Sequence, residues 1–223
     1  MEDENKLIEE RREKLKTLRS RGIAFPNDFR RNNLSAELHE KYGTKTKEEL
    51  EPLKAEATVA GRMVLKRVMG KASFATLQDS GGKIQIYVSN DSVGTETHDQ
   101  FKHWDLGDLV GVAGSIFRTK TGELTIQANT IRLLVKALRP LPEKFHGIAD
   151  QELKYRQRYV DLIVSDKTRD VFSKRVKIIQ ALRDAMSADG YLEVETPMMQ
   201  PIPGGAVARP RLSDRRRGDD LPG

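Results

Sequence analysis

Five short runs in which apolar and polar residues alternate fill the stretch 57–134, and their order limits the folds open to the chain. We expect strands at 57–67, 72–78, 83–89, 109–118 and 123–134. The tetrapeptide DSGG at 79–82 has the turn chemistry of a hairpin, and a helical stretch at 96–104 separates the third run from the fourth. Three strands, a helix and two more strands predict a five-stranded OB-fold barrel.

Helical patterns precede this barrel. Residues 5–20 carry leucines and an isoleucine at helical spacing, and Gly22 follows where helices end. A short helix is predicted at 34–42. The capping-box pattern of Thr46 and Glu49 begins another short helix.

Helices also follow the barrel. The segment 138–147 has two prolines and a glycine and is typical of a linker, and 151–164 has a helical pattern. Residues 167–189 form the strongest amphipathic pattern of the chain. We expect a strand at 191–199, which Pro197 interrupts.

These patterns predict an α+β fold: N-terminal helices, the OB-fold barrel, and the first helix and strand of a further domain. The expected segments are a helical part at 1–54, the barrel domain at 55–136, a linker at 137–150, the start of a second domain at 151–210 and a disordered tail at 211–223.

Composition excludes several classes of protein. The chain of 223 residues contains no cysteine, which rules out disulfides and thiolate metal sites. No apolar run approaches the roughly 20 residues that span a bilayer, and the charged N-terminus has no signal-peptide core. We therefore expect a cytoplasmic protein that binds no membrane. A net charge of +6 is compatible with a polyanionic partner.

Phe74 occupies an unusual position. If Leu77 and the isoleucines of 83–89 face the core, Phe74 lies on the outer face beside Gln85. Such a ring commonly packs under a loop. Here the strand 2–3 face of an OB-fold, a neighbouring amide and nearby Arg62, Lys66, Arg67 and Lys71 favour single-stranded RNA, with base stacking on Phe74 and base-edge reading by Gln85. Strict alternation turns Arg67 inward unless the strand bulges near 68–70.

Four stretches carry a resemblance to a known family from about residue 5 to Pro210. They are GRMVLKRVMGKASFATLQDSGGKIQIYV, FKHWDLGDLVGVAGSIFRTKTGEL, LLVKALRPLPEKFHGIADQELKYRQRYVDLI and YLEVETPMMQPIPGGAVARP. Together they resemble the bacterial-type class II lysyl-tRNA synthetases. The resemblance implies that the barrel binds the uridine-rich anticodon loop of lysine tRNA. The matching anticodon-binding positions are Arg67, Phe74, Gln85 and Glu123.

The resemblance also implies roles outside the barrel. In this family the helix and strand at 167–200 build a homodimer interface, here with Phe172, Val176, Ile179 and Pro197. Gly204 matches a loop of the lysine pocket. Each position has a simpler alternative: a solvated glutamate at Glu123, ordinary core on the helix, and a plain turn at Gly204.

The sequence departs from the family after Pro210, where it reads RLSDRRRGDDLPG and the second and third class II motifs do not follow. Full-length relatives use ATP and Mg²⁺, and we expect neither to bind this chain well. No residue is assigned as catalytic or metal-binding. His39, His98, His103 and His146 are expected on the surface or in the linker. The expectation is a lysine–tRNA ligase fragment that keeps tRNA binding and is inactive alone.

Two other functions stay open on the sequence. One is a stand-alone OB protein that binds single-stranded RNA or DNA without catalysis. The other is a non-catalytic partner that docks onto a full-length synthetase through 167–200.

Overall fold

The computed structural model describes residues 2–142, 148 and 150–195. It divides into two compact units, Met1–Ser165 and Asp166–Gly223, which are described separately. The first unit contains α1 (Glu2–Ser20), α2 (Ser35–Tyr42), α3 (Lys47–Leu50), β1 (Glu56–Met69), β2 (Ala72–Gln78), β3 (Lys83–Ser89), α4 (Asn90–Val93), α5 (Thr95–Lys102), β4 (Leu109–Arg118), β5 (Leu124–Val135), α6 (Gln151–Arg156) and α7 (Arg158–Val164). The described part of the second unit contains α8 (Asp166–Ala188).

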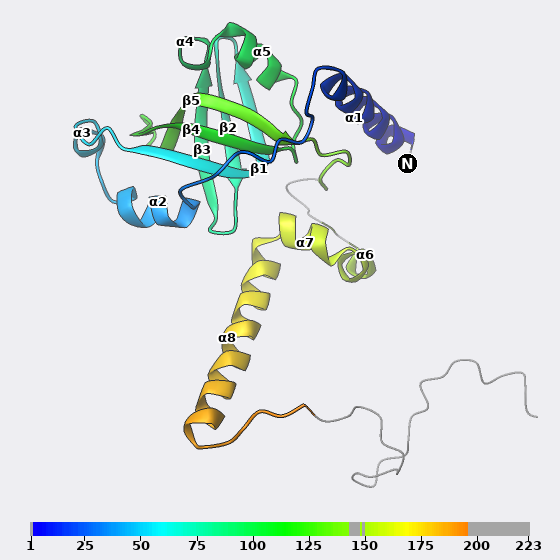
Figure 1. The fold of residues 1–223 in the computed structure, drawn as a ribbon, viewed down its shortest axis with the longest axis vertical. Coiled ribbons are helices and arrows are strands. Elements are labelled where there is room, and N and C mark those ends of the chain that lie inside the picture. Colours follow the sequence, from blue (N-terminus) through cyan, green and yellow to red (C-terminus); the bar gives the residue numbers. More distant parts are fainter. Residues whose placement is uncertain (1, 143–147, 149, 196–223) are drawn as a thin grey trace, which may run out of the picture. The chain divides into compact units, whose positions relative to one another are not determined.

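The five strands close into a barrel in the order β1-β2-β3-β5-β4 (Figure 1). Neighbouring strands are antiparallel except β3 and β5, which pair in parallel, and β1 closes the barrel against β4. The predicted OB-fold arrangement, and with it the α+β class, is confirmed.

The barrel interior is filled by the apolar set of each alternating strand. Its most deeply buried members are Val59, Met63, Leu77, Ile86, Val88, Val110, Val112 and Ile126. Where the pairing is regular, the residues between these apolar side chains face outward, because successive side chains of a strand point to opposite faces. This alternation makes the outer face available for a binding site.

One end of the barrel is closed by α5, whose Phe101 is fully buried. Figure 1 shows α4 and α5 together over this end. Lys66 on β1 donates to the carbonyl oxygen of Lys102 at 2.9 Å and to that of Trp104, which holds the end of α5 against the barrel wall.

A network of ion pairs, buried on the barrel side and partly exposed at Lys14, attaches α1 to the barrel. Lys136 contacts Asp105 at 2.6 Å and the buried Asp108 at 2.7 Å, and Lys14 of α1 contacts Asp105 at 2.8 Å. Burial acts to raise the pKa of Asp105, but the hydrogen bonds from Lys136 and Lys14 outweigh it and hold that pKa below its ordinary value. The carboxylate thus stays charged and joins α1 to the end of β5.

The helices largely follow the sequence patterns. The capping box of α3 is present, with Glu49 N–H donating to Thr46 Oγ1 at 3.4 Å and Thr46 N–H donating to Glu49 Oε2 at 2.7 Å. The expected helix at 151–164 is two helices, because Gln157 leaves the helical region at φ −116° and ψ 53°.

The expected strand at 191–199 is not observed. Its described part, 191–195, forms neither helix nor strand, and 196–199 lies outside the described residues. A strand needs a hydrogen-bonded neighbour, and none of the strands in the described ranges pairs with this segment. The alternating sequence at 191–195 is therefore insufficient by itself to form a strand.

The second unit consists, as far as it is described, of α8 and the segment up to residue 195. No residue of α8 is buried within the chain. Its exposed apolar side chains include Val171, Val176, Ile178, Leu182 and Met186. Across the described ranges, no helix combines the length and apolarity needed to cross a membrane.

Candidate nucleic-acid interface

A groove of about 500 Å³ lies on the outer face of the barrel, where β1, β2 and β3 meet the turn between β4 and β5. Its walls include Arg67, Phe74, Gln85 and Lys120. Three of the four residues predicted to bind an anticodon therefore line one cavity, although they come from three different strands.

Phe74 is half-buried and belongs to a row of aromatic side chains that crosses three strands. Its ring centroid lies 5.0 Å from that of Tyr87 on β3, with the ring planes tilted by 52°. Tyr87 in turn meets Phe117 on β4 edge-on at 6.0 Å. These contacts hold the Phe74 ring in place, so that a base can stack on it without first ordering the side chain.

Arg67 lies on the same outer face as Phe74, its register partner across β1 and β2. The side chain is exposed and lines the groove. The register shifts by one residue between Met63 and Leu65, and this bulge reverses the alternation downstream of it. Alternation alone allowed this orientation only with a bend or bulge near 68–70; the bulge lies earlier in the strand, since the pairing is regular from Leu65 to Met69.

Gln85 is held by a residue that the sequence analysis missed. Its Nε2 donates to Thr125 Oγ1 at 3.2 Å, and the Thr125 hydroxyl donates to the carbonyl oxygen of Glu123 at 3.2 Å. Because that hydroxyl proton is committed to Glu123, the threonine oxygen accepts from Gln85 and fixes the orientation of the amide. Oε1 and the second amide hydrogen then remain for a ligand.

This arrangement suits a uracil edge. Uracil offers one N–H donor flanked by two carbonyl acceptors, which Oε1 and the remaining N–H of Gln85 complement. Arg67 adds donors on the other side of Phe74. Thr125 is completely buried and lies opposite Gln85 in the pairing of β3 with β5, which a single sequence does not reveal.

Glu123 is the last residue of the turn between β4 and β5. Its N–H donates to Thr119 Oγ1 at 3.0 Å, and its carbonyl oxygen accepts from the N–H of Thr119 at 3.0 Å. Thr119, Lys120 and Thr121 line the groove, whereas Glu123 is exposed just beyond it. Its role in reading a base stays a prediction.

The electrostatics of the groove favour an anionic ligand. Among the residues that the structure describes, Arg67 and Lys120 are the charged residues of its walls, and no carboxylate lines it. Single-stranded nucleic-acid sites combine such cations with an aromatic ring.

The expectation that His98 is a surface residue is wrong. The side chain is completely buried, with Nε2 2.8 Å from Ser73 Oγ and Nδ1 2.5 Å from Asn90 Oδ1. His98 is buried because it lies on the same face of α5 as Phe101, which is three residues later and also buried. His39 and His103 are exposed, and His146 lies outside the described residues.

This buried cluster does not form a nucleophilic site. Ser73 is completely buried, so its hydroxyl cannot reach a substrate. Within the described ranges, no group of three or more His, Asp or Glu side chains could hold a metal ion.

The remaining predicted site residues lie beyond the barrel. Phe172, Val176 and Ile179 are exposed on α8, by 37%, 66% and 40% respectively. Pro197 and Gly204 lie outside the described residues.

Two family comparisons match the two halves of this architecture. Residues 57–134 match the family described as OB-fold nucleic acid binding domain. Residues 150–218 match the family described as tRNA synthetases class II (D, K and N). The first match covers the barrel and its groove.

Curated relatives decide the assignment. The chain is 62% identical over 208 residues to the lysine–tRNA ligase of Thiobacillus denitrificans, covering 93% of this chain and 42% of that protein. It is 60% identical over 209 residues to that of Chromobacterium violaceum, and 62% identical over 209 residues to that of Dechloromonas aromatica, with 94% of this chain and 42% of the relative covered in both. The chain belongs to the lysine–tRNA ligase family. It spans the N-terminal 42% of these ligases.

Proposed function

We propose that the chain binds the anticodon loop of lysine tRNA through the groove around Phe74, as the N-terminal part of a lysine–tRNA ligase. The observation that carries this proposal is the convergence of Phe74, Arg67 and Gln85 on one cavity free of carboxylates. The uridine-rich lysine anticodon offers a base that stacks on Phe74 and an edge that Gln85 complements.

The activity of the whole ligase is part of the same proposal. In it, lysine and ATP form lysyl-adenylate, and lysine is then transferred to the 3′ end of the tRNA, with Mg²⁺ supporting the ATP chemistry. The residues described here supply tRNA selection, because a tRNA whose anticodon fits the groove is held while the rest of the ligase acts.

Substitution of Phe74 by alanine tests this function. Stacking on an aromatic side chain contributes about 1–3 kcal/mol per base, so the Kd for a lysine anticodon stem-loop should rise roughly tenfold to a hundredfold. Fluorescence anisotropy with a labelled stem-loop measures it. Phe25→Ala is the matched control, since Phe25 is exposed and lies outside the groove walls.

A second stem-loop, with its central uridine replaced by cytidine, separates this proposal from non-specific binding. The groove should prefer the uridine form, whereas a general single-strand binder should hold both equally, with a strong dependence on salt. Equal affinity of the F74A variant and the unaltered chain for the lysine stem-loop would refute the proposal.

We also propose that the apolar stripe of α8, with Phe172, Val176 and Ile179, associates with a second copy of the ligase. Its support is the exposure of these side chains along a 23-residue helix that buries no residue in its own chain.

A further inference from the structure

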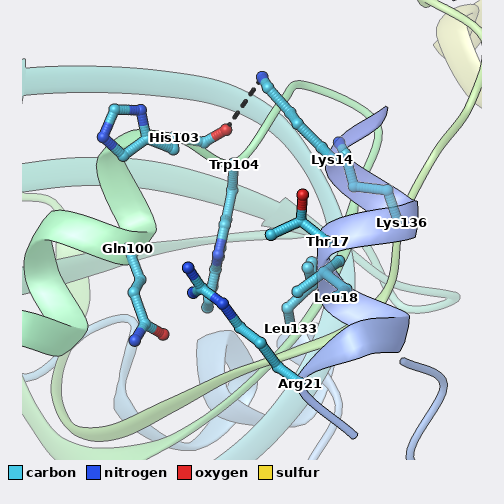
Figure 2. A pocket seen from close by; sticks show the side chains of 9 residues that line it. All are labelled: Lys14, Thr17, Leu18, Arg21, Gln100, His103, Trp104, Leu133 and Lys136. Atoms are coloured by element: carbon cyan, nitrogen blue, oxygen red, sulfur yellow. Dashed lines mark hydrogen bonds between the residues drawn. The ribbon is translucent and has the colours of Figure 1, made fainter. Parts of the chain in front are cut away.

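A second pocket lies between α1, the end of α5 and β5, and it shares no lining residue with the groove around Phe74 (Figure 2). Its volume is about 240 Å³. Trp104, Arg21, Thr17 and Gln100 are among the side chains that line it, and Figure 2 shows Arg21 reaching from the end of α1 toward Gln100 and Trp104.

Trp104 forms a fixed aromatic wall. Its half-buried ring meets Phe101 edge-on, with centroids 5.4 Å apart and planes at 73°, and its carbonyl oxygen accepts from Lys66. The indole N–H donates to none of the residues that the structure describes. The ring is therefore positioned in advance for stacking, with a donor left for a ligand oxygen.

Arg21 is a positively charged residue of this pocket with no ion-pair partner in the described part of the chain. Lys14 and Lys136, which also line it, are paired with Asp105 and Asp108. The exposed guanidinium of Arg21 makes no ion pair or side-chain hydrogen bond within the described part of the chain. None of the described residues that line the pocket is a carboxylate, so the surplus positive charge favours an anion.

The pocket also carries polar groups that a ring edge could use. The Gln100 amide donates to Glu96 Oε1 at 3.3 Å and keeps its carbonyl oxygen for a donor. The Thr17 hydroxyl donates to the carbonyl oxygen of Glu13 at 3.1 Å, which leaves the threonine oxygen as an acceptor. Both side chains therefore present acceptors to a base with N–H groups.

The walls of the pocket do not depend on a ligand for their arrangement. Lys14 donates to the carbonyl oxygen of His103 at 3.2 Å and to Asp105, which joins α1 directly to the loop that carries Trp104. Arg11, one turn earlier, donates to the carbonyl oxygens of Ala137 and Arg139 at 3.2 and 2.9 Å. The two sides are thus held together before anything binds.

We propose that this pocket binds a nucleotide, with its base stacked on Trp104 and its phosphate held by Arg21. An uncharged planar ligand would make no ion pair with Arg21, and a simple anion such as phosphate would not stack on the indole of Trp104. The nucleotide is either a free mononucleotide or one unit of an RNA strand. The proposal does not rest on anticodon binding, because the two cavities have separate walls.

The experiment uses the fluorescence of Trp104, the single tryptophan of the chain. The unaltered protein is titrated with AMP, adenosine and inorganic phosphate, with excitation on the red edge of indole absorption, where the nucleotide is transparent. We expect saturable quenching by AMP, and binding of adenosine roughly tenfold weaker because it lacks the charge-assisted contact. The indole N–H resonance in an amide NMR spectrum should shift with the same midpoint.

Arg21→Gln should raise the Kd for AMP about tenfold, because one charge-assisted contact is lost. Arg19→Gln is the matched control: Arg19 lies one half-turn away with its guanidinium 5.9 Å from the Phe25 ring centroid, outside the pocket walls. Phe74→Ala should leave the AMP titration unchanged, which separates a failure here from a failure of the anticodon proposal.

Single-stranded oligouridine, titrated into the Phe74→Ala variant, distinguishes the two sources of the nucleotide. Tighter quenching by the oligomer than by UMP at equal nucleotide concentration assigns the pocket to RNA, and equal or weaker quenching assigns it to a free nucleotide. Absence of saturable quenching and of an indole shift with every nucleotide would overturn the proposal. Unchanged AMP affinity in the Arg21→Gln variant would overturn it as well.

Discussion

At the scale of single residues, the groove depends on side chains that no ligand needs to touch. Thr125 is completely buried, yet its hydroxyl decides which atoms of Gln85 face the groove. Tyr87 supports the Phe74 ring in the same way. The two roles that we propose, base stacking by Phe74 and base reading by Gln85, thus each depend on a positioning residue.

Replacing Thr125 by valine tests this division. Valine keeps the volume and removes the hydroxyl, so Gln85 loses its fixed orientation while Phe74 is unaffected. We expect the preference for a central uridine over cytidine to fall roughly fivefold to tenfold, the worth of about one hydrogen bond, with little change in affinity for the cytidine stem-loop.

Thr125→Ser retains the hydroxyl and is the control for this experiment. It should keep the uridine preference close to that of the unaltered chain. A Thr125→Val protein that still discriminates fully would show that Gln85 orients itself without the threonine.

His98 predicts a pH dependence of stability. Burial, followed by the charge of Lys102, lowers its pKa, and Asp99 only partly opposes this. The unfolded chain therefore binds more protons than the folded chain below the ordinary histidine pKa. The contribution of neutral His98 to the free energy of unfolding should be fully present above about pH 6.5, and the free energy of unfolding should decline as the pH falls below that value.

Urea unfolding at a series of pH values measures this dependence. His98→Gln removes the titrating group and should flatten the decline between about pH 5 and 6.5. His39→Gln, the same substitution at an exposed position, is the matched control. An identical slope in the His98→Gln protein would contradict the assignment.

At the scale of secondary-structure elements, two irregularities of the strands shape the barrel. The register shift in β1 brings Arg67 to the outer face, and a second shift lies where Ala113 and Gly114 of β4 pair with β5. At Gly114 the strands come so close that a Cβ would stand 1.8 Å from the carbonyl oxygen of Gln127.

Gly114→Ala should consequently destabilise the barrel. The added methyl group meets backbone, which cannot rotate away, so we expect a loss of about 1–3 kcal/mol or more in the free energy of unfolding. Urea denaturation followed by circular dichroism measures it, with Ser115→Ala on the outer face as the control. Equal midpoints for both variants would mean that β5 shifts to admit the methyl group.

At the scale of the whole molecule, the packed core belongs to the first unit. The buried side chains of the described ranges lie between Arg11 and Asp161, whereas α8 buries none. Folding and the groove therefore depend on residues 1–165, and the exposed stripe of α8 remains available for the association that we propose.

A fragment of residues 1–165 tests this partition. It should unfold at the same urea concentration as the full chain and bind the lysine stem-loop with the same Kd, within about twofold, since the buried core and the groove walls belong to the first unit. Analytical ultracentrifugation should show that the full chain self-associates and the fragment does not. Loss of the unfolding transition or of stem-loop binding in the fragment would contradict the partition.

The sequence by itself determined the barrel and the outer position of Phe74. Strand order, turn residues and period-two burial are local properties, and each run of 57–134 carries its own pattern. The capping box of α3 and the long helix α8 were predictable for the same reason. The resemblance to a known family then predicted Arg67 and Glu123 as anticodon-binding residues, which alternation alone did not predict.

Only the tertiary structure decided what depends on pairing between distant segments. The β1 bulge, the hydrogen bond from Gln85 to Thr125 and the burial of His98 against Ser73 each join residues far apart in sequence. The segment 191–195 shows the converse, since an alternating pattern forms no strand there without a partner. A local pattern fixes which face of an element is apolar, whereas register and partner follow from the closure of the barrel as a whole.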